Sequence, residues 1–294
     1  MSEAEAGIVL DWSTAVRLIL EQFPELSGLD IRPLTAKGTD NHIFRIGDDL
    51  CARFPKAPWA AQTAGREAAA LPLFACAPLA VPSVYGLGKR AEGYPHAWSV
   101  LSWLPGEPME DSALRNPEDE AVRLAAFFRF VRSLPADPAF RFSAVNNGRG
   151  APLASRSERF DAALKQLPCL DDGFARRLWA RALQAGPAGD PGWLHGDAHP
   201  GNVLVEDGRV SGVIDWGLCG VGDGACDLLT AWAMFDRAPR EVFRKAIGAT
   251  DSEWLRGAGW ALSVAVIYLP YAYEHGLRSD MSEKMIERLR EEFT

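Results

Sequence analysis

Two short runs in the second half of the sequence carry polar residue types that could act together on a phosphate. The first is His195-Gly196-Asp197-Ala198-His199-Pro200-Gly201-Asn202, and the second is Ile214-Asp215-Trp216-Gly217. Transfer of a phosphoryl group needs a carboxylate that orients the attacking hydroxyl and accepts its proton, and oxygen ligands that hold Mg2+ against the phosphates of the donor. One aspartate, an asparagine five residues later and a second aspartate thirteen residues beyond it supply these groups, and Mg2+ prefers such oxygen ligands.

The same residues allow two other interpretations. A loop rich in histidine and aspartate could be a solvated turn without any chemistry. His195, Asp197 and His199 also alternate, so that on a strand all three would face one side and could bind a single metal ion, as in a metallohydrolase. Pro200-Gly201 instead favours a loop, and the remaining histidines are isolated in the sequence. Two runs at this spacing across a predicted hairpin therefore favour phosphoryl transfer.

The composition is that of a globular protein with a sizeable core. The chain has 294 residues, of which 48% are hydrophobic and 24% are charged, which is enough for one large domain or two smaller ones. The formal net charge of -8 does not favour binding to nucleic acid and would attract a cationic ligand. We therefore expect no nucleic-acid partner, and no feature of the sequence indicates an obligate protein partner.

The cysteines and the apolar segments predict a cytoplasmic protein with reduced thiols. Five cysteines are scattered without a C-x-x-C pair, which argues against a disulfide framework or a thiolate zinc site. Residues 1–5 carry acid where a signal peptide would carry base. The longest uncharged stretch, residues 257–273, contains Pro270 and falls short of the ~20 residues that span a bilayer. We expect this stretch to be a buried helix and the protein to have no membrane segment.

Hydrophobic spacing in the first hundred residues predicts an antiparallel sheet with one main helix. A helical pattern over residues 11–23 precedes the sheet. The main helix is the alanine-rich segment 59–71, which Pro72 interrupts. The predicted strands cover residues 31–34, 42–46, 50–54, 83–88 and 98–103.

Residues 104–108, with the sequence Leu-Pro-Gly-Glu-Pro, interrupt this pattern and mark the predicted lobe boundary. It separates an N-terminal lobe at 1–103 from a C-terminal lobe at 104–294. Residues 203–214 are predicted to form a hairpin around Asp207-Gly208. The fold class is therefore α+β, with a small β-rich lobe, a linker and a larger, mostly helical lobe. The predicted helices of the second lobe cover residues 120–134, 157–167, 174–185, 227–235, 240–247 and 281–293, with Asp280 and Glu283 as the N-terminal cap of the last one.

The motifs H-G-D-x-x-x-x-N, at 195–202, and I-D-x-G, at 214–217, resemble the signature of the protein-kinase-like small-molecule kinases. This group contains the aminoglycoside phosphotransferases and the related macrolide, choline and homoserine kinases. The likeness extends over nearly the whole chain and includes residues 221–228, which resemble the family's V-G-D-P-A-x-D-L run. The resemblance implies a protein-kinase-like fold with a small antiparallel sheet lobe and a larger helical lobe.

The resemblance also implies roles for the central residues. Asp197 would be the catalytic base, and His195 would brace its loop rather than react. Asn202 and Asp215 would hold Mg2+. Asp227 is expected to be buried and to bind the backbone of the catalytic loop, with a helix cap as the simpler alternative.

The N-terminal lobe would bind the nucleotide. By resemblance, Gly38 and Thr39 belong to the phosphate loop, and Arg53 stands where a lysine is expected. Alternation along strand 50–54 places Arg53 on one face together with Cys51, in position to contact phosphate. Glu67 is the expected partner of Arg53, with an exposed surface ion pair as the alternative.

The segment between the lobes would hold the purine base. By resemblance, the side chain of Leu101 would lie behind the base. Ser102 and Leu104 would contact the purine edge through their backbone. An ordinary edge strand is the alternative, because backbone contacts leave no trace in the side-chain types.

The implied function is transfer of the γ-phosphate of ATP or GTP to a hydroxyl of a small molecule. An aminoglycoside-like or other amino-bearing, cationic acceptor is the first expectation. The acidic residues Asp223, Asp251, Glu253 and Glu274 could line its site or could be solvated surface. A metabolite kinase of the choline or homoserine type is the alternative among enzymes, and Arg53 supports a nucleotide-binding pseudokinase or regulatory module. The sequence leaves the acceptor and the choice between ATP and GTP open.

Overall fold

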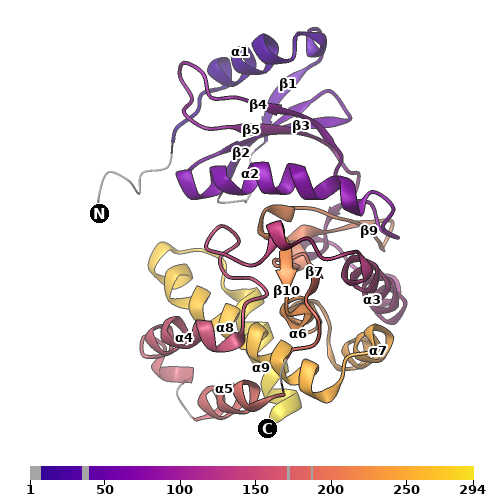
Figure 1. The fold of residues 1–294 in the computed structure, drawn as a ribbon, viewed down its shortest axis with the longest axis vertical. Coiled ribbons are helices and arrows are strands. Elements are labelled where there is room, and N and C mark those ends of the chain that lie inside the picture. The colour runs from indigo at the N-terminus through magenta and orange to yellow at the C-terminus, as the bar shows by residue number, and fades with distance from the viewer. Residues whose placement is uncertain (1–7, 35–39, 171–172, 187) are drawn as a thin grey trace.

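The computed structural model describes residues 8–34, 40–170, 173–186 and 188–294. They form a small upper lobe built on a sheet and a larger, mostly helical lower lobe (Figure 1). This arrangement confirms the predicted α+β fold with two lobes. Among the described residues, no helix is both long enough and apolar enough to cross a membrane.

The upper lobe is an antiparallel sheet with one helix on each face (Figure 1). Its strands lie in the order β1-β2-β3-β5-β4. Each element of this lobe begins and ends within one residue of its predicted bounds. The elements of this lobe are α1 (Trp12–Gln22), β1 (Ile31–Leu34), β2 (Asn41–Ile46), β3 (Leu50–Pro55), α2 (Pro58–Ala70), β4 (Val84–Gly88) and β5 (Trp98–Ser102).

Side-chain alternation in β3 separates two cores. Ala52 and Phe54 point into the core under α1, where Phe54 stacks on Trp98 at a centroid distance of 4.4 Å. Cys51 points to the opposite face and belongs to the core that continues into the lower lobe. Arg53 shares this face and reaches Glu67 on α2. The period of two in a strand thus places a cation on the inner face of the sheet, at the lobe junction.

The chain leaves the sheet after Ser102, the last residue of β5. A two-residue strand, β6 (Glu107–Pro108), then pairs with β8 of the lower lobe. The segment between these strands connects the two lobes. A domain boundary between residues 103 and 104 is compatible with this path and stays a prediction.

The lower lobe packs helices around two small antiparallel sheets, with strand orders β6-β8-β9 and β10-β7. The predicted hairpin is formed by β8 and β9, and its turn residues Asp207 and Gly208 have φ values of 51° and 73°, as a type I′ turn requires. The sequence pattern does not predict β6, β7 and β10, which are two or three residues long. The remaining elements are α3 (Pro117–Ser133), α4 (Ser157–Leu164), α5 (Phe174–Gln184), β7 (Gly192–Leu194), β8 (Val203–Glu206), β9 (Arg209–Val213), β10 (Gly220–Gly222), α6 (Leu229–Met234), α7 (Arg237–Ile247), α8 (Asp251–His275) and α9 (Asp280–Phe293).

Helices α3, α6, α7 and α9 do not begin at the predicted residues. Helix α3 begins earlier, at Pro117, because Asn116 caps it by accepting hydrogen bonds from the two amides that follow Pro117. The predicted cap of α9 is wrong. Asp280 is the first helical residue, and its carboxylate accepts hydrogen bonds from Arg278. Glu283 accepts hydrogen bonds from the hydroxyls of Ser279 and Tyr273 instead of closing a capping box.

Helix α8 forms the centre of the lower lobe and contains the long uncharged stretch of the sequence. It packs against α4, α5, α6 and α9, and most of its residues between Trp254 and Leu269 are buried. A Cβ at Gly257 would lie 2.6 Å from the Leu228 Cβ, and one at Gly259 would lie 2.5 Å from a methyl of Leu153. These glycines allow the close approach that buries α8, as expected from the sequence.

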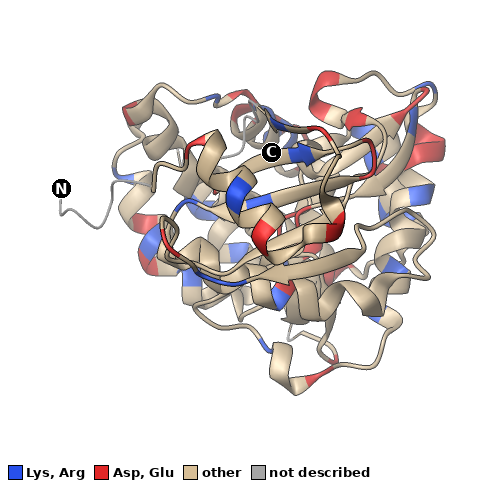
Figure 2. Cartoon of the chain, turned by 90° about the horizontal axis from the view of Figure 1, so that it is seen from above, with Lys and Arg blue, Asp and Glu red and all other residues tan. Residues whose placement is uncertain are grey.

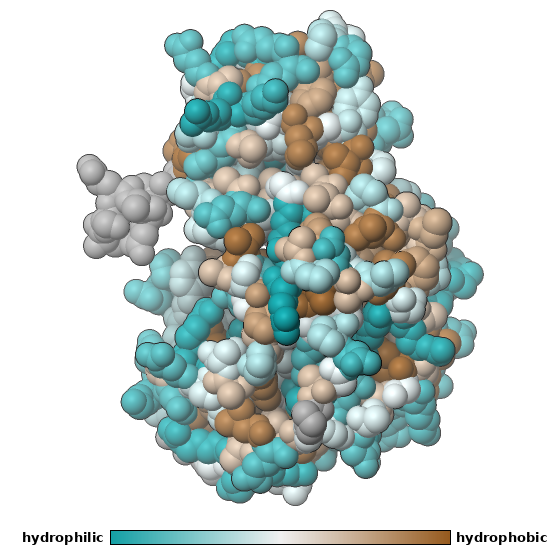
Figure 3. Space-filling model, in the orientation of Figure 1, coloured by the Kyte–Doolittle hydropathy of each residue, from teal (hydrophilic) through white to brown (hydrophobic). Residues whose placement is uncertain are grey.

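The charged side chains are dispersed over the molecule. In the view of Figure 2, acidic and basic residues are interspersed over the ribbon. On the face shown in Figure 3, apolar side chains form small groups among hydrophilic ones. The net negative charge is therefore not gathered into one strongly acidic surface in these views.

Arg240 and Arg156, two of the buried arginines of the lower lobe, have different partners. Arg240 donates to Glu291, Glu292 and the Phe235 carbonyl oxygen. Arg156 donates to the Ser263 hydroxyl and lies 4.9 Å from the Trp260 ring centroid. Within the part of the chain that the structure describes, no carboxylate pairs with Arg156, and its burial lowers the pKa of its guanidinium.

This contrast predicts unequal effects of removing each charge. Arg240→Met should lower the free energy of unfolding by about 2–3 kcal/mol, because it removes a buried partner of Glu292. Arg156→Met should cost less than about 1 kcal/mol, because it removes a charge that no carboxylate compensates. Urea denaturation followed by tryptophan fluorescence measures both. Equal losses in the two variants would contradict this interpretation.

Candidate active site

The loop between β7 and β8 carries the first motif and is fixed by one buried carboxylate. Asp227, from the turn before α6, accepts hydrogen bonds from the amides of His195 and Gly196, both at 2.8 Å. Its side chain is almost fully buried. This confirms the expectation that Asp227 binds the backbone of the loop. These two amides donate the hydrogen bonds that a carboxylate needs when it is buried away from water.

His195 connects the two motif runs. Its Nδ1 accepts a hydrogen bond from the Asp197 amide at 3.1 Å, and its Nε2 lies 3.0 Å from the Ile214 carbonyl oxygen. Because Nδ1 accepts, the proton must reside on Nε2, which donates to Ile214. Both ring nitrogens are therefore engaged within the protein. This geometry supports the interpretation of His195 as a brace and leaves it no lone pair for a metal ion.

The metallohydrolase interpretation finds no support in this geometry. His199 uses its Nδ1 to accept the Gly201 amide at 3.1 Å, and its Nε2 lies 3.7 Å from the Asp197 Oδ2. Across the residues described, no group of three or more histidine, cysteine, aspartate and glutamate side chains is arranged to hold a metal ion. The alternating side chains belong to a loop, as Pro200-Gly201 indicates.

Asp197 opens on a cleft of about 460 Å3 between the lobes. Its carboxylate is 29% exposed, and Arg149 donates to its Oδ1 at 3.0 Å. The cleft is lined by Asp40, Asn41, Trp59, Gln62 and Thr63 from the upper lobe and by Ala144, Val145, Asn147, Arg149, Asp197, Asp215, Gly217 and Leu218 from the lower lobe. Asp197 and Asp215 thus face the same solvent-filled space.

Asn202 lies between the two aspartates. Its side-chain amide donates to the Asp197 carbonyl oxygen at 2.9 Å, and its own carbonyl oxygen accepts the Ile214 amide at 2.9 Å. The amide oxygen of its side chain is left as an acceptor. The bond to Ile214 holds the backbone of Asn202 next to the residue that precedes Asp215. Asn202 and Asp215 each carry a side-chain oxygen of the kind that Mg2+ prefers. This donor set fits Mg2+ when phosphate oxygens and water complete the coordination.

Asp215 follows β9 in a left-handed conformation, with a φ of 64°. Few residues other than glycine adopt this conformation, and those that do often occur at functional sites. Burial in the junction would raise the pKa of Asp215, but the guanidinium of Arg53 outweighs this effect and holds the pKa below its ordinary value. The carboxylate therefore stays ionised, as a metal ligand must.

Arg53 joins three elements at the lobe junction. Its Nη1 donates to both carboxylate oxygens of Glu67, at 2.7 and 2.8 Å, and its Nη2 donates to the Asp215 Oδ1 at 2.6 Å. Glu67, on α2, also accepts the Trp216 amide at 2.8 Å. The Glu67 side chain is only 3% exposed, so this is not the exposed surface pair of the alternative interpretation. The two carboxylates raise the pKa of Arg53 above its ordinary value.

The other predicted nucleotide contacts are only partly described. Gly38 and Thr39 lie outside the described residues. Leu101 is buried beneath the sheet and faces Cys51 across the β3–β5 pair. The Ser102 amide already donates to the Ser83 carbonyl oxygen at 2.8 Å, so only the Ser102 carbonyl remains for a base. The purine contacts of Ser102 and Leu104 stay predictions.

Sequence reasoning missed two contacts of the site. It did not predict the bond of Arg53 to Asp215, which joins residues 162 positions apart. It assigned no role to Arg149, although the surrounding segment 147–153 resembles a loop of the related kinases. None of the four acidic residues considered for the acceptor site lines the cleft at Asp197. Asp223 pairs with Arg256, Asp251 with Arg244 and Glu253 with Arg132, while Glu274 is exposed.

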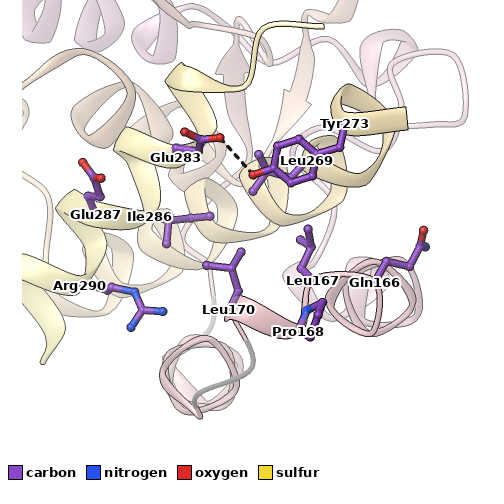
Figure 4. A pocket seen from close by; sticks show the side chains of 10 residues that line it. All are labelled: Gln166, Leu167, Pro168, Leu170, Leu269, Tyr273, Glu283, Ile286, Glu287 and Arg290. Carbon is purple, nitrogen blue, oxygen red and sulfur yellow. Dashed lines mark hydrogen bonds between the residues drawn. The ribbon is translucent and has the colours of Figure 1, made fainter. Parts of the chain in front are cut away.

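A second cavity, of about 370 Å3, lies between α8, α9 and the segment that follows α4 (Figure 4). Leu167, Leu170, Leu269 and Ile286 give it an apolar floor, and charged side chains of α9 stand at its edge. It contains no residue of either motif. The cleft at Asp197 is therefore the better candidate for an active site.

A small antiparallel sheet lobe over a larger helical lobe, with carboxylates at their junction, is the arrangement of the protein-kinase-like class of folds. A family model described as the phosphotransferase enzyme family matches residues 30–260 of this chain. The chain belongs to this family.

Two curated proteins are similar to part of the chain. Viomycin phosphotransferase from Streptomyces vinaceus is 32% identical over 180 residues, which cover 55% of each protein. Aminoglycoside 3'-phosphotransferase from Escherichia coli is 27% identical over 159 residues, which cover 52% of this chain and 57% of that protein. The chain thus matches little more than half the length of these relatives.

Solved structures share the fold over nearly the whole chain. The GDP complex of aminoglycoside 2'-phosphotransferase-IIIa superposes with a TM-score of 0.74 and 20% identity, covering 96% of this chain and 98% of that one. The macrolide 2'-phosphotransferase of Brachybacterium faecium gives a TM-score of 0.62 and 19% identity, covering 92% and 96%. At these identities the likeness concerns the fold.

The junction predicts a pH-dependent defect when Arg53 is replaced. Arg53→Met should lower the free energy of unfolding at pH 8 by about 3–5 kcal/mol, because Glu67 stays buried without its cation. Burial and Asp215 both raise the pKa of Glu67. Without Arg53 the folded carboxyl therefore binds a proton more strongly than the unfolded one does, so the stability of the variant should recover as the pH falls from 8 to 5.

Chemical denaturation at several pH values measures this effect. Arg53→Lys is the matched control, since it keeps a cation near Glu67 and should show a smaller loss and no recovery at pH 5. A loss in Arg53→Met that is independent of pH would show that Glu67 is not held as a buried carboxylate.

Proposed function

We propose that the protein transfers the γ-phosphate of ATP or GTP to a hydroxyl group of a small molecule. The observation that carries this proposal is that Asp197 and Asp215 line one cleft. Asn202 and His195 join the two motif runs beside it, through the bonds of Asn202 to Asp197 and Ile214 and of His195 to Ile214. Asp197 orients the attacking hydroxyl and accepts its proton. Asn202 and Asp215 hold Mg2+, which when bound supplies positive charge beside the phosphates of the donor.

The remaining residues of the junction handle the nucleotide. Arg53 carries its charge on the inner face of the sheet, where the phosphates of a nucleotide bound under β3 would lie, and Glu67 keeps it there. Leu101, Ser102 and Leu104 contact the base in this proposal, and Gly38 and Thr39 contact the phosphates. Support comes from the family and from the fold of proteins solved with GDP or ADP.

The acceptor in this proposal is a hydroxyl-bearing, amino-bearing antibiotic. The names of the two curated relatives, which refer to viomycin and aminoglycosides, support this class. The acidic net charge of the chain and the carboxylates of Asp40, Asp197 and Asp215 around the cleft also favour a cationic acceptor. The proposal includes a cytoplasmic location and requires no protein partner.

A nucleotide-binding module without turnover is the second candidate. One observation favours it, the bond of Arg53 to Asp215, because a metal ion at Asp215 would share that carboxylate with a guanidinium. The presence of Asp197, Asn202 and Asp215 together favours the enzyme. Binding of nucleotide without transfer to any acceptor or to water would favour the module.

Replacement of the base should separate catalysis from nucleotide binding. Asp197→Ala should lower transfer by about 10²–10⁴-fold and leave nucleotide affinity nearly unchanged, because the carboxylate acts on the acceptor. The assay is a phosphorylation screen of viomycin, aminoglycosides, macrolides and amino alcohols with ATP and with GTP. Asp190→Ala, an exposed carboxylate outside the cleft, is the control. Unchanged turnover in Asp197→Ala would contradict the role of Asp197 as the catalytic base.

Removal of one metal ligand should abolish the effect of Mg2+ on stability. Nucleotide with Mg2+ should raise the thermal midpoint of the wild type above the value with nucleotide and EDTA, because a ligand that binds only the folded state stabilises it. Asp215→Asn should lose most of this difference. A full Mg2+ effect in Asp215→Asn, measured by differential scanning fluorimetry, would assign the metal to other groups.

A further inference from the structure

The loop of residues 143–153 places Arg149 against Asp197 through an unusual backbone. Asn147, Gly148 and Gly150 all have positive φ values, of 53°, 66° and 80°. The buried side chain of Asn146 accepts the Ser143 amide and donates to the Arg149 carbonyl oxygen. The conformation on both sides of Arg149 is therefore set by its own loop.

This loop is packed tightly on the strands that flank the active site. A Cβ at Gly150 would lie 2.5 Å from a methyl of Leu194 at the end of β7, and one at Gly222 in β10 would lie 2.3 Å from the Gly150 carbonyl oxygen. That same oxygen accepts the Asp223 amide at 2.8 Å. Because β7 leads directly into the loop that carries Asp197, Arg149 and Asp197 are held in one rigid frame.

The guanidinium of Arg149 donates a hydrogen bond to one carboxylate oxygen of Asp197. Its Nη2 donates to the Asp197 Oδ1 at 3.0 Å. Its Nε and Nη1 are buried and have no hydrogen-bond partner among the described residues. The Nε2 of His199 lies 3.7 Å from the Asp197 Oδ2, which exceeds hydrogen-bond distance. The carboxylate is thus fixed at Oδ1, and Oδ2 is left for a ligand in the cleft.

We propose that Arg149 is the positioning residue of the catalytic base, an inference that rests on the proposed function. By holding Oδ1, it fixes the side-chain rotamer of Asp197 and directs Oδ2 at the acceptor hydroxyl. In the transfer step the acceptor oxygen forms a bond to the γ-phosphorus and its proton passes to Oδ2. The bond from the γ-phosphorus to the bridging oxygen breaks, and the nucleoside diphosphate leaves with that oxygen.

An arginine suits this role better than a lysine. Its planar fork presents nitrogens at fixed angles, whereas an ammonium group on a flexible stem can approach either carboxylate oxygen. Two of its nitrogens are buried without a partner, so the Asp197 Oδ1 is the acceptor that the described part of the chain offers this guanidinium. Arg149 comes from a loop outside both motifs, which explains why the motif residues alone do not reveal it.

The test compares Arg149→Ala and Arg149→Lys with the wild type. Without Arg149, Asp197 should no longer be held in its reactive orientation. The kcat of Arg149→Ala should therefore fall by about 10–100-fold, while KM for the nucleotide stays within about twofold. Arg149→Lys should retain an intermediate kcat, because it keeps the charge but not the fork. Arg141→Ala, an exposed arginine just before the loop, should behave as the wild type. Transfer to the best acceptor and to water are both measured.

Chemical rescue distinguishes positioning from a structural role. Guanidinium ion at non-denaturing concentration should restore part of the turnover of Arg149→Ala and none of that of Asp197→Ala. Wild-type kcat in Arg149→Ala overturns the inference, and so does a loss without rescue that is accompanied by a lower thermal midpoint in both Arg149 variants. Absence of wild-type transfer to any acceptor or to water overturns the proposed function, and this inference with it.

Discussion

A buried carboxylate needs a cation or several hydrogen-bond donors beside it, and Glu67 obtains these from both lobes. It accepts hydrogen bonds from Arg53 in the sheet above and from the Trp216 amide in the loop below. Arg53 in turn reaches Asp215 in that same loop. Separation of the lobes would break the bonds to Trp216 and Asp215 together and leave the buried Glu67 with Arg53 as its remaining donor. The position of the upper lobe over Asp197 therefore depends in part on this small polar junction.

In the lower lobe, the polar groups of the site are likewise held by hydrogen bonds from other elements, but the donors are of other kinds. Asp227 uses two backbone amides instead of a guanidinium, and His195 uses both ring nitrogens to join the motif runs. Arg149 holds Asp197 from a third segment. Each group with a proposed chemical role is thus fixed by a residue that is distant in the sequence. Such contacts are satisfied only when the whole lobe has folded, which couples the geometry of the site to the stability of the core.

The sequence predicted those features that local patterns determine. Hydrophobic periods located the strands of the upper lobe, and Asp207-Gly208 located the hairpin because a type I′ turn needs positive φ at both positions. The burial of Asp227 followed from family resemblance. The short strands β6, β7 and β10 were not predicted, because two or three residues are too few to show a hydrophobic period. The bond of Arg53 to Asp215 and the position of Arg149 arise from tertiary packing, and the acceptor site lies among side chains for which one sequence sets few constraints.

The pairing of Arg240 with α9 bears on how the protein is made. Glu292 accepts hydrogen bonds from Arg240, and from the indole nitrogens of Trp232 and Trp254 at 3.0 and 2.6 Å. These donors lie on α6, α7 and α8, and all three donate to one residue near the C-terminal end of α9. A chain that emerges from the ribosome can form the upper lobe early, but the helical lobe cannot satisfy its interior until Glu292 has been synthesised. Folding of the lower lobe is therefore completed only after Glu292 has emerged, which is later than the emergence of the residues of both motifs.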